Sequence, residues 1–345
     1  MHHINSNAKK MSLNIAFWGK ALQTIPRVSK EEWFNLDIIS RWLVATRSGV
    51  IIMTAISAMI GGLLAFASGT FNLLNFSVAF FGLLLAHASN NLLNDWTDHR
   101  RGVDKDNYFR AQYGPHILEH GYITPKRFLR YIYITLLLAM TCGAFLAITG
   151  PISVLYLGLT GLFFLLFYTW PLKYIGLGEP TVVLVWGPLM IGGTYFVSSG
   201  YQWSWDVAIL SALYAIGPTS VIFGKHIDKL KQDRAKKIFT LPVIIGEDVA
   251  RYSTLVMWAV QYIGFAWLVI TGKLTWPVLV IVFALPYLIK KGKPFLKKRP
   301  ETKPDNYEAE AWPLYFVRYA FEYNKRFSLL FLLGIIIHVI LTRLT

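Results

Sequence analysis

Long apolar stretches separated by short polar segments dominate this chain of 345 residues. Nine of them approach the length of roughly 20 residues that a helix needs to cross a hydrocarbon core of about 30 Å. They occupy positions 49–67, 76–94, 128–148, 152–169, 181–198, 207–224, 252–271, 276–289 and 327–341. The pattern therefore predicts an all-α polytopic membrane protein with nine transmembrane helices.

The composition supports this prediction. Hydrophobic residues make up 54% of the chain and charged residues 15%, and the mean hydropathy is +0.44, far from the balance of soluble domains. A formal net charge of +15 would also suit nucleic acid. Basic residues that flank so many apolar spans are instead expected to set topology and to meet anionic lipid heads. We expect the lipid bilayer as a partner and no nucleic acid.

The basic residues also predict an orientation. With a cytoplasmic amino terminus, 32 of the 34 Lys and Arg residues fall on the cytoplasmic side, and only Lys273 and Arg343 lie opposite. This is the bias that the positive-inside rule describes. The loops expected in the cytoplasm are 95–127, 225–251 and 290–326.

The chain divides into two parts on this interpretation. Residues 1–47 form a cytoplasmic segment in which 31–47 is expected to be one amphipathic helix lying in the membrane interface. A simple lead-in to the first span is the alternative. Residues 48–345 form the transmembrane domain.

A first polar cluster ends the second predicted span. Asn91, Asn94, Asp95 and Asp98 follow the i, i+3, i+4, i+7 pattern, so all four lie on one stripe of a helix. The next residues break the apolar pattern, and a turn there can bring Asp104 back toward the same place. Neighbouring carboxylates repel one another unless a cation lies between them, and hard oxygen ligands suit Mg²⁺. A solvated, capped helix end is the alternative.

A second cluster follows the sixth predicted span. Asp228 and Asp233 are five positions apart, about 140° around an ideal helix. Both can face one ligand only if the helix ends or unwinds between them. An ordinary charged surface is the alternative for this stretch. Carboxylates at membrane depth are costly and usually functional, so the two clusters together predict a metal-bridged diphosphate site at a membrane surface.

Several motifs bring a known family into view. They are Asn-x-x-Asn-Asp-x-x-Asp at 91–98, Asp233-Arg234 with the continuation Thr-Leu-Pro-Val-Ile-Ile-Gly at 240–246, and Tyr-Thr-Trp-Pro-Leu-Lys at 168–173 with Gly178-Glu179. This ordered set resembles the UbiA superfamily of intramembrane aromatic prenyltransferases. One departure is Lys229, where the second motif of the family commonly has an acidic residue.

Finer features are most similar to the menaquinone-pathway branch, which prenylates 1,4-dihydroxy-2-naphthoate. These are the six-residue step from Asp98 to Asp104, and Gly-Pro-Leu-Met at 187–190 followed by Gly-Thr-Tyr at 193–195. The resemblance implies helices around a central cavity and Mg²⁺-assisted transfer of a polyprenyl group from its diphosphate to an aromatic acceptor.

The resemblance also implies roles for individual residues. The expected metal ligands are Asp95, Asp98, Asp104, Asp228 and Asp233, and all of these except Asp104 are also expected to be catalytic. The expected diphosphate-binding residues are Asn91, Asn94, Arg47, Arg110, Lys173, Lys225 and Arg234. Tyr168 or Tyr195 is expected to stabilise the allylic cation through its aromatic face.

Other functions remain open at this point. A UbiA-like enzyme with a different acceptor fits the same motifs. CDP-alcohol phosphotransferases also place aspartates near a helix end, but they carry Gly directly after the second Asp, where this chain has His99. A cation-coupled transporter would use intramembrane carboxylates as well. Transporter sites usually lie near the bilayer midplane, whereas these carboxylates lie at the ends of spans.

Overall fold

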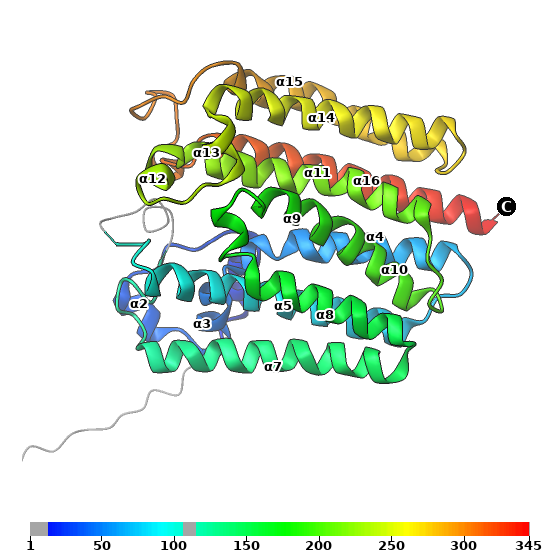
Figure 1. The fold of residues 1–345 in the computed structure, drawn as a ribbon, viewed down its shortest axis with the longest axis horizontal. Helices are drawn as coiled ribbons and strands as arrows, with labels where there is room; N and C mark the ends of the chain where they lie inside the picture. Colours follow the sequence, from blue (N-terminus) through cyan, green and yellow to red (C-terminus); the bar gives the residue numbers. More distant parts are fainter. Residues whose placement is uncertain (1–12, 106–114, 345) are drawn as a thin grey trace, which may run out of the picture.

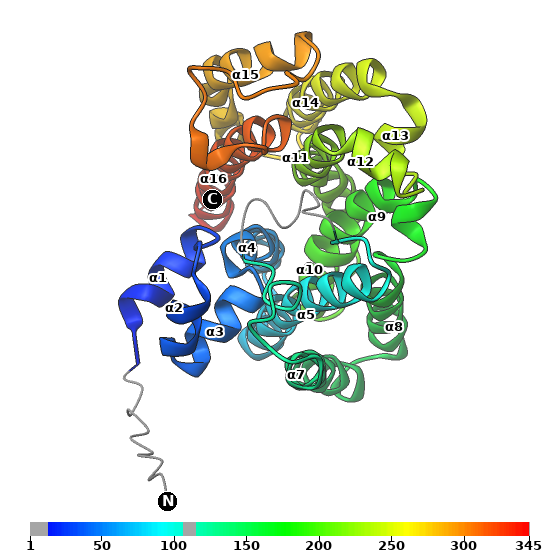
Figure 2. The same ribbon diagram turned by 90° about the vertical axis from the view of Figure 1, so that its left-hand side faces the viewer.

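The computed structural model describes residues 13–105 and 115–344, which form a bundle of roughly parallel helices (Figure 1). The long helices are α4 (Ile52–Ala67), α5 (Leu73–Arg100), α7 (Pro125–Thr149), α8 (Ile152–Phe167), α11 (Trp205–Asp228), α14 (Glu247–Ile270) and α16 (Phe316–Leu344). The shorter ones are α1 (Ile15–Gln23), α2 (Lys30–Asn35), α3 (Ile38–Ala45), α9 (Gly178–Leu184), α10 (Gly193–Ser198), α12 (Leu230–Ala235), α13 (Leu241–Ile245) and α15 (Leu285–Gly292). Seen end-on (Figure 2), α14 and α15 are outermost on one side and α7 is outermost on the opposite side.

The all-helical, membrane-spanning prediction is confirmed, but the number of nine spans is not. Among the described residues, seven helical stretches are long and apolar enough to cross a membrane, at 48–67, 73–100, 125–149, 178–198, 205–228, 247–270 and 316–343. The fourth of these consists of α9, a π-helix, Val185–Gly192, and α10. The predicted span at 152–169 is α8, which at 16 residues is shorter than all seven. The one at 276–289 begins as a 3₁₀-helix, Trp276–Ala284, and becomes α-helical only in α15. Pro286 lies at that change, where its missing N–H cannot join a continuous α-helical ladder.

The interfacial segment differs from the single helix expected over 31–47. It forms α2 and α3, because the chain is extended at Leu36 and Asp37. Ser29 and Glu32 form a capping box at the start of α2. Asp37 accepts hydrogen bonds at the start of α3, so the chain starts a second helix instead of continuing the first.

Asp37 also attaches α1 to this segment. Its carboxylate accepts hydrogen bonds from the backbone of Ser40, at 2.9 Å, and from the indole of Trp18 in α1, at 3.2 Å. Burial alone would raise the pKa of Asp37, but these hydrogen bonds hold it at about 2. The contribution of Asp37 to stability is therefore fully present above the ordinary pKa of about 4 and is lost as the pH falls through about 2.

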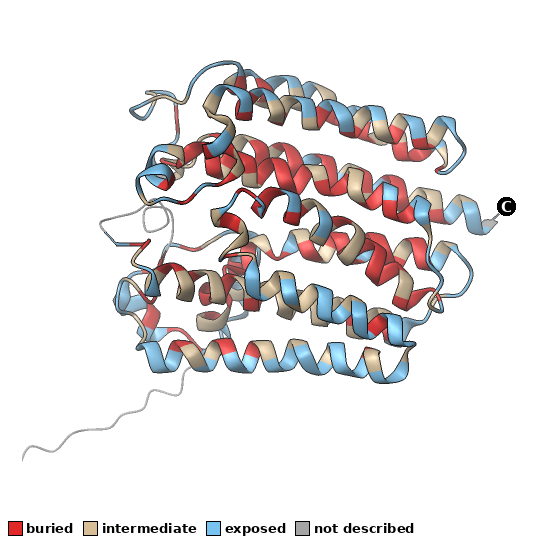
Figure 3. Ribbon diagram, in the orientation of Figure 1, coloured by how far each residue is buried: buried red, intermediate tan, exposed pale blue. Residues whose placement is uncertain are grey.

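Burial divides the helices into an inner and an outer set (Figure 3). In the most apolar 18 residues of α11, 72% of the stretch is buried within the protein, against 22% in the corresponding stretch of α7. The outward face of α7 carries Leu137, Leu138 and Ile148, and Ile148 is 84% exposed. Such a continuous apolar outer face suits contact with hydrocarbon. The chain is therefore a multi-pass integral membrane protein.

Small residues let the inner helices approach closely. A Cβ atom added at Gly61 of α4 would lie 2.5 Å from the carbonyl oxygen of Ile191, and one at Gly224 of α11 would lie 2.8 Å from the backbone of Phe316. Membrane helices associate through this kind of backbone proximity, since lipid provides no hydrophobic drive between them.

We expect Gly61→Ala to destabilise the bundle, because the new methyl group would meet backbone that cannot move independently. Overpacking of this kind costs about 1–3 kcal/mol. Gly158→Ala in α8 is the matched control, since a Cβ atom there meets nothing within 4 Å. Thermal unfolding of the two variants in detergent would test this. Equal melting temperatures would show that α4 does not depend on this contact.

Candidate functional site

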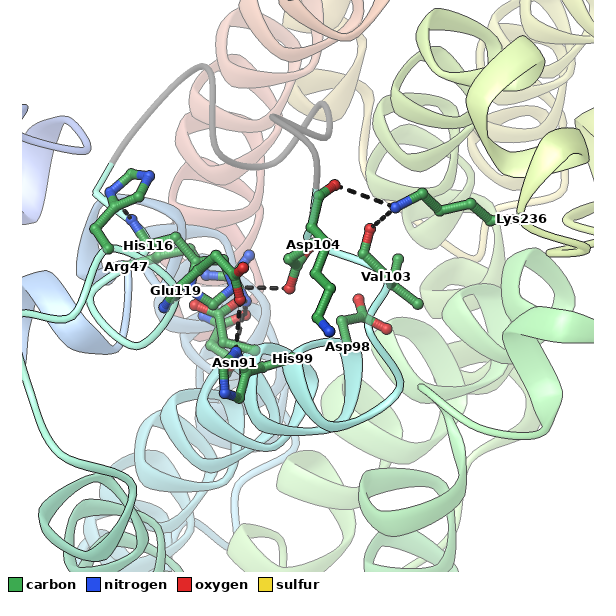
Figure 4. Close-up of polar contacts among 12 residues, drawn as sticks. Arg47, Asn91, Asp98, His99, Val103, Asp104, His116, Glu119 and Lys236 are labelled. Atoms are coloured by element: carbon green, nitrogen blue, oxygen red, sulfur yellow. Dashed lines mark hydrogen bonds and ion pairs between the residues drawn. The ribbon is translucent and has the colours of Figure 1, made fainter.

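The turn after α5 brings Asp104 back over the end of the helix (Figure 4). The N–H of Val103 donates to the carbonyl of Asp98 at 2.8 Å, and the N–H of Gly102 donates to the carbonyl of His99 at 3.0 Å. Gly102 has φ +67°, a left-handed conformation that glycine adopts without strain. This is a Schellman motif, and it confirms the expected reversal of the chain.

Asp104 is held in place by a histidine. Its Oδ2 atom lies 2.7 Å from Nε2 of His116, and both side chains are buried. Its other oxygen, Oδ1, is buried without a hydrogen-bond partner among the described residues. A buried carboxylate oxygen without a hydrogen-bond donor is costly, so this position suits a bound cation.

Arg47 binds the polar stripe of α5 near its middle. Its Nη2 atom lies 3.2 Å from Oδ1 of Asp95, and it donates to the backbone oxygen of Asn91 at 3.0 Å. The amide of Asn91 in turn donates to the carbonyl of Thr46 at 2.8 Å. Arg47 has φ 54°, uncommon for a residue with a side chain. These contacts hold that conformation and aim a buried guanidinium at the stripe.

Lys173 reaches the next carboxylate along the stripe. Its ammonium lies 3.1 Å from each oxygen of Asp98, and both residues are buried. Lys173 belongs to a short 3₁₀ turn that follows α8. The ion pair therefore connects the end of α5 to the loop between α8 and α9.

The helix ends between Asp228 and Asp233, as their spacing of five positions requires if both are to face one ligand. Helix α11 ends at Asp228, and α12 begins at Leu230. Asp233 is fully buried, and its Oδ2 atom lies 3.0 Å from the ammonium of Lys229. Asp228 is also buried, but its oxygens accept hydrogen bonds from backbone N–H groups at the start of α16.

The two acidic segments meet at one end of the bundle. Val103, after α5, and Ile238, after α12, belong to one buried apolar cluster. The ammonium of Lys236 also donates to the carbonyl oxygen of Val103 (Figure 4). Segments more than 100 residues apart in the chain are thus adjacent in space.

The donor chemistry of this region fits a divalent cation. Asp95, Asp98, Asp104 and Asp233 offer hard carboxylate oxygens of the kind that Mg²⁺ prefers. Across residues 13–105 and 115–344, no three His, Cys, Asp or Glu side chains are close enough to form a metal site. Each of the four carboxylates contacts a basic side chain: Arg47, Lys173, His116 and Lys229, respectively.

A large cavity adjoins this polar end. Its volume is about 1290 Å³, and most of its wall is apolar side chains from α5, α7, α8, α10 and α11. Its polar lining residues include Arg47, Asn91, Asn94, Tyr168 and Lys225. The cavity therefore combines a long apolar space with a cluster of amide and basic groups.

The remaining residues that the sequence predicts for the site lie in different surroundings, and only some of them line the cavity. Lys225 forms no hydrogen bond or ion pair with another residue of the described chain, and Asn94 donates to the hydroxyl of Thr169 at 3.2 Å. Tyr195 lies in the apolar core among residues of α4 and α11 and not in the cavity wall. Arg234 donates to the carbonyl of Val243 at 3.1 Å. Arg110 lies outside the described residues.

Sequence reasoning missed three partners of the carboxylates. They are His116, Lys229 as the partner of Asp233, and Arg299, whose Nε atom lies 3.3 Å from Asp228. The i, i+4 spacing of Lys229 and Asp233 was a usable signal. His116 and Arg299 are joined to their partners by the tertiary fold, and no local spacing indicates them.

Comparison with known proteins identifies relatives of this arrangement. The model of the UbiA prenyltransferase family matches residues 54–314. UbiA prenyltransferase domain-containing protein 1 of Xenopus tropicalis is 26% identical over 215 residues, which are 59% of this chain and 59% of the frog protein. The 1,4-dihydroxy-2-naphthoate octaprenyltransferase of Bacillus subtilis (strain 168) is 23% identical over 255 residues, 73% of this chain and 81% of that protein.

Solved structures share the fold. A UbiA homologue from Aeropyrum pernix K1 superposes with a TM-score of 0.62 at 17% identity, covering 83% of this chain and 98% of that one. A UbiA homologue from Archaeoglobus fulgidus bound to GPP and Mg²⁺ gives a TM-score of 0.51 at 13% identity, covering 82% and 96% of the two chains.

The matched region is shorter than some of these relatives. This chain spans 59% of the length of the frog protein and 58% of its Drosophila melanogaster homologue. The family match nevertheless extends over well more than half of the chain, from α4 to the loop before α16. The protein therefore belongs to the UbiA prenyltransferase family.

Proposed function

We propose that this protein is a Mg²⁺-dependent membrane prenyltransferase that moves a polyprenyl group from its diphosphate to an aromatic acceptor. The observation that carries the proposal is the position of the carboxylate-rich end of the bundle beside a cavity of about 1290 Å³ with a mostly apolar wall. A diphosphate and an isoprenoid tail need these two environments next to each other. The A. fulgidus homologue, solved with GPP and Mg²⁺, is consistent with this use of the fold.

The polar end would bind the diphosphate. Lys225 is the strongest candidate for a direct contact, because it lines the cavity without a partner among the described side chains. Arg47 and the amides of Asn91 and Asn94 line the same region. Basic groups that contact phosphate oxygens through charge-assisted hydrogen bonds would orient the donor with its carbon chain toward the apolar part.

The carboxylates Asp95, Asp98, Asp104 and Asp233 would hold the metal ions. Asp228, which the motif resemblance also implied as a ligand, accepts backbone hydrogen bonds at the start of α16. Mg²⁺ bound by the other four carboxylates would neutralise the diphosphate leaving group as a Lewis acid. For the carboxylates to ligate it, basic partners such as Lys173 have to turn from carboxylate to phosphate.

The apolar part of the cavity would exclude water from the reacting carbon. Tyr168 lines the cavity and could place its ring near developing positive charge. Because Tyr195 is packed in the core, Tyr168 is the better candidate of the two for this role.

The acceptor proposed here is 1,4-dihydroxy-2-naphthoate. Its support is the menaquinone-type motif pattern together with the name of the B. subtilis relative. We further propose that the carboxylate-rich end faces the cytoplasm. The support is the distribution of basic residues, since positive charge concentrates on that side of bacterial and eukaryotic membranes.

We expect Asp98→Asn to reduce product formation by about 100-fold or more, because several kcal/mol of charge stabilisation would be lost with the ligand. Asp305→Asn, which changes an exposed loop aspartate, should leave the rate unchanged. The measurement is Mg²⁺-dependent release of diphosphate by purified protein. An unchanged rate in Asp98→Asn would remove this residue from the metal site.

We expect prenylated dihydroxynaphthoate when the protein receives a polyprenyl diphosphate, Mg²⁺ and a panel of quinone precursors, and no product after chelation of the metal. Mass spectrometry of the lipid extract identifies the product. Prenylation of a different phenol would overturn the acceptor and leave the reaction class intact. Cation-coupled uptake of a solute into proteoliposomes, without formation of any prenylated product, would instead favour a transporter.

A further inference from the structure

Asp228 anchors the beginning of the last helix. Its Oδ2 atom accepts hydrogen bonds from the N–H groups of Tyr315, at 2.9 Å, and Val317, at 3.0 Å, and its Oδ1 atom accepts one from Phe316 at 2.9 Å. The first N–H groups of a helix have no partner within the helix, and a negative charge is favoured there by the helix dipole. From the end of α11, Asp228 thus satisfies the first two N–H groups of α16 and that of Tyr315, the residue before it.

Arg299 extends this anchor to the loop before α16. Its Nε atom lies 3.3 Å from Oδ1 of Asp228, and its Nη2 atom donates to the carbonyl of Pro313 at 2.9 Å. The guanidinium also lies 4.6 Å from the ring centre of Trp312, a favourable cation–π contact. Asp228 and Arg299 therefore clamp the residues that lead into α16.

The clamped segment is a wall of the cavity. Glu308, Ala311 and Leu314 line the cavity from the loop, and Val317, Arg318 and Phe321 line it from α16. Arg318 lies 2.6 Å from a carboxylate oxygen of Glu308, so this wall has its own ion pair. Figure 2 shows the chain entering α16 at the same end of the bundle as α12, which follows Asp228.

The location of this wall suggests which substrate it meets. The apolar part of the cavity, among α7 and α8, suits the prenyl tail, and Arg47, Asn91 and Lys225 suit the diphosphate. The wall from Glu308 to Arg318 presents both polar and apolar side chains to the cavity. Neither the prenyl tail nor the diphosphate requires such a mixture. A polar aromatic acceptor is the remaining substrate that the reaction requires.

We propose that Asp228 is a positioning residue that fixes the acceptor-facing wall of the cavity, and that it does not act as a metal ligand. This inference rests on the proposed function and assigns Asp228 differently from its motif. Each of its two oxygens already accepts two donors, from the start of α16 and from Arg299. Together these contacts use the roughly four lone-pair sites of a carboxylate, so a metal ion would have to displace at least one of them.

The first test is hydrogen exchange of the full-length protein in detergent, followed by mass spectrometry of peptides covering 307–321. Asp228→Asn replaces one accepting oxygen by an NH₂ group that opposes the helix N–H donors. We expect the amides of Tyr315, Phe316 and Val317 to exchange at least about tenfold faster, since hydrogen bonds to charged groups are strong. Asp98→Asn is the matched control and should leave these amides unchanged.

The second test separates acceptor binding from metal binding by steady-state kinetics. In Asp228→Asn we expect the acceptor KM to rise by about fivefold or more, with the half-saturating Mg²⁺ concentration unchanged within about twofold. In Asp98→Asn we expect the reverse, a higher half-saturating Mg²⁺ concentration and an unchanged acceptor KM. Arg299→Lys keeps the charge but loses the bridge to Pro313, so it should give a smaller shift of acceptor KM in the same direction.

Three results would overturn the proposal: unchanged amide exchange in Asp228→Asn, a raised Mg²⁺ requirement in that variant, or an unchanged acceptor KM. If Asp228→Asn does not fold, Arg299→Lys provides the same readouts. If the unmodified protein forms no prenylated product at all, the proposed function fails. The exchange measurement then still decides whether Asp228 holds the wall.

Discussion

Neutralisation of buried carboxylates is the constraint on which the functional end of this protein depends. Asp95, Asp98 and Asp233 are almost inaccessible to solvent, and an uncompensated charge in such a place is strongly destabilising. Each is compensated by a basic side chain, and those of Asp95 and Asp98 come from segments distant from α5 in the chain. The charges suited to binding a metal ion and a diphosphate therefore also hold the interfacial segment and the α8–α9 loop against the bundle.

Features that follow from local periodicity could be predicted from the sequence. The stripe from Asn91 to Asp98 needs only the helical repeat, and the turn at Gly102 needs only a glycine beyond the last helical residue. The contacts of Asp228 could not be predicted, because its partners come from the loop and helix that begin some 70 or more positions later. The place of Tyr195 in the core likewise depends on how α4 and α11 pack around α10.

The cavity and the acidic end share helix α5 and otherwise depend on different segments. The apolar wall of the cavity includes side chains of α7 and α8, two helices with exposed apolar outer faces. The polar end is formed by the last turns of α5, by the loop between α8 and α9, and by the segment that follows the heavily buried α11. Helix α5 therefore connects the proposed space for a prenyl tail with the proposed diphosphate site.

The glycine turn after α5 has a consequence for how this region can vary. The placement of Asp98 relative to Asp104 depends on two main-chain hydrogen bonds and on the missing side chain of Gly102. Arg100 and Arg101, which lie between them, contribute no side-chain atom to that geometry and rest on nearby aromatic rings. The positive charge at positions 100 and 101 can therefore change while the two main-chain hydrogen bonds keep the two acidic groups at their spacing.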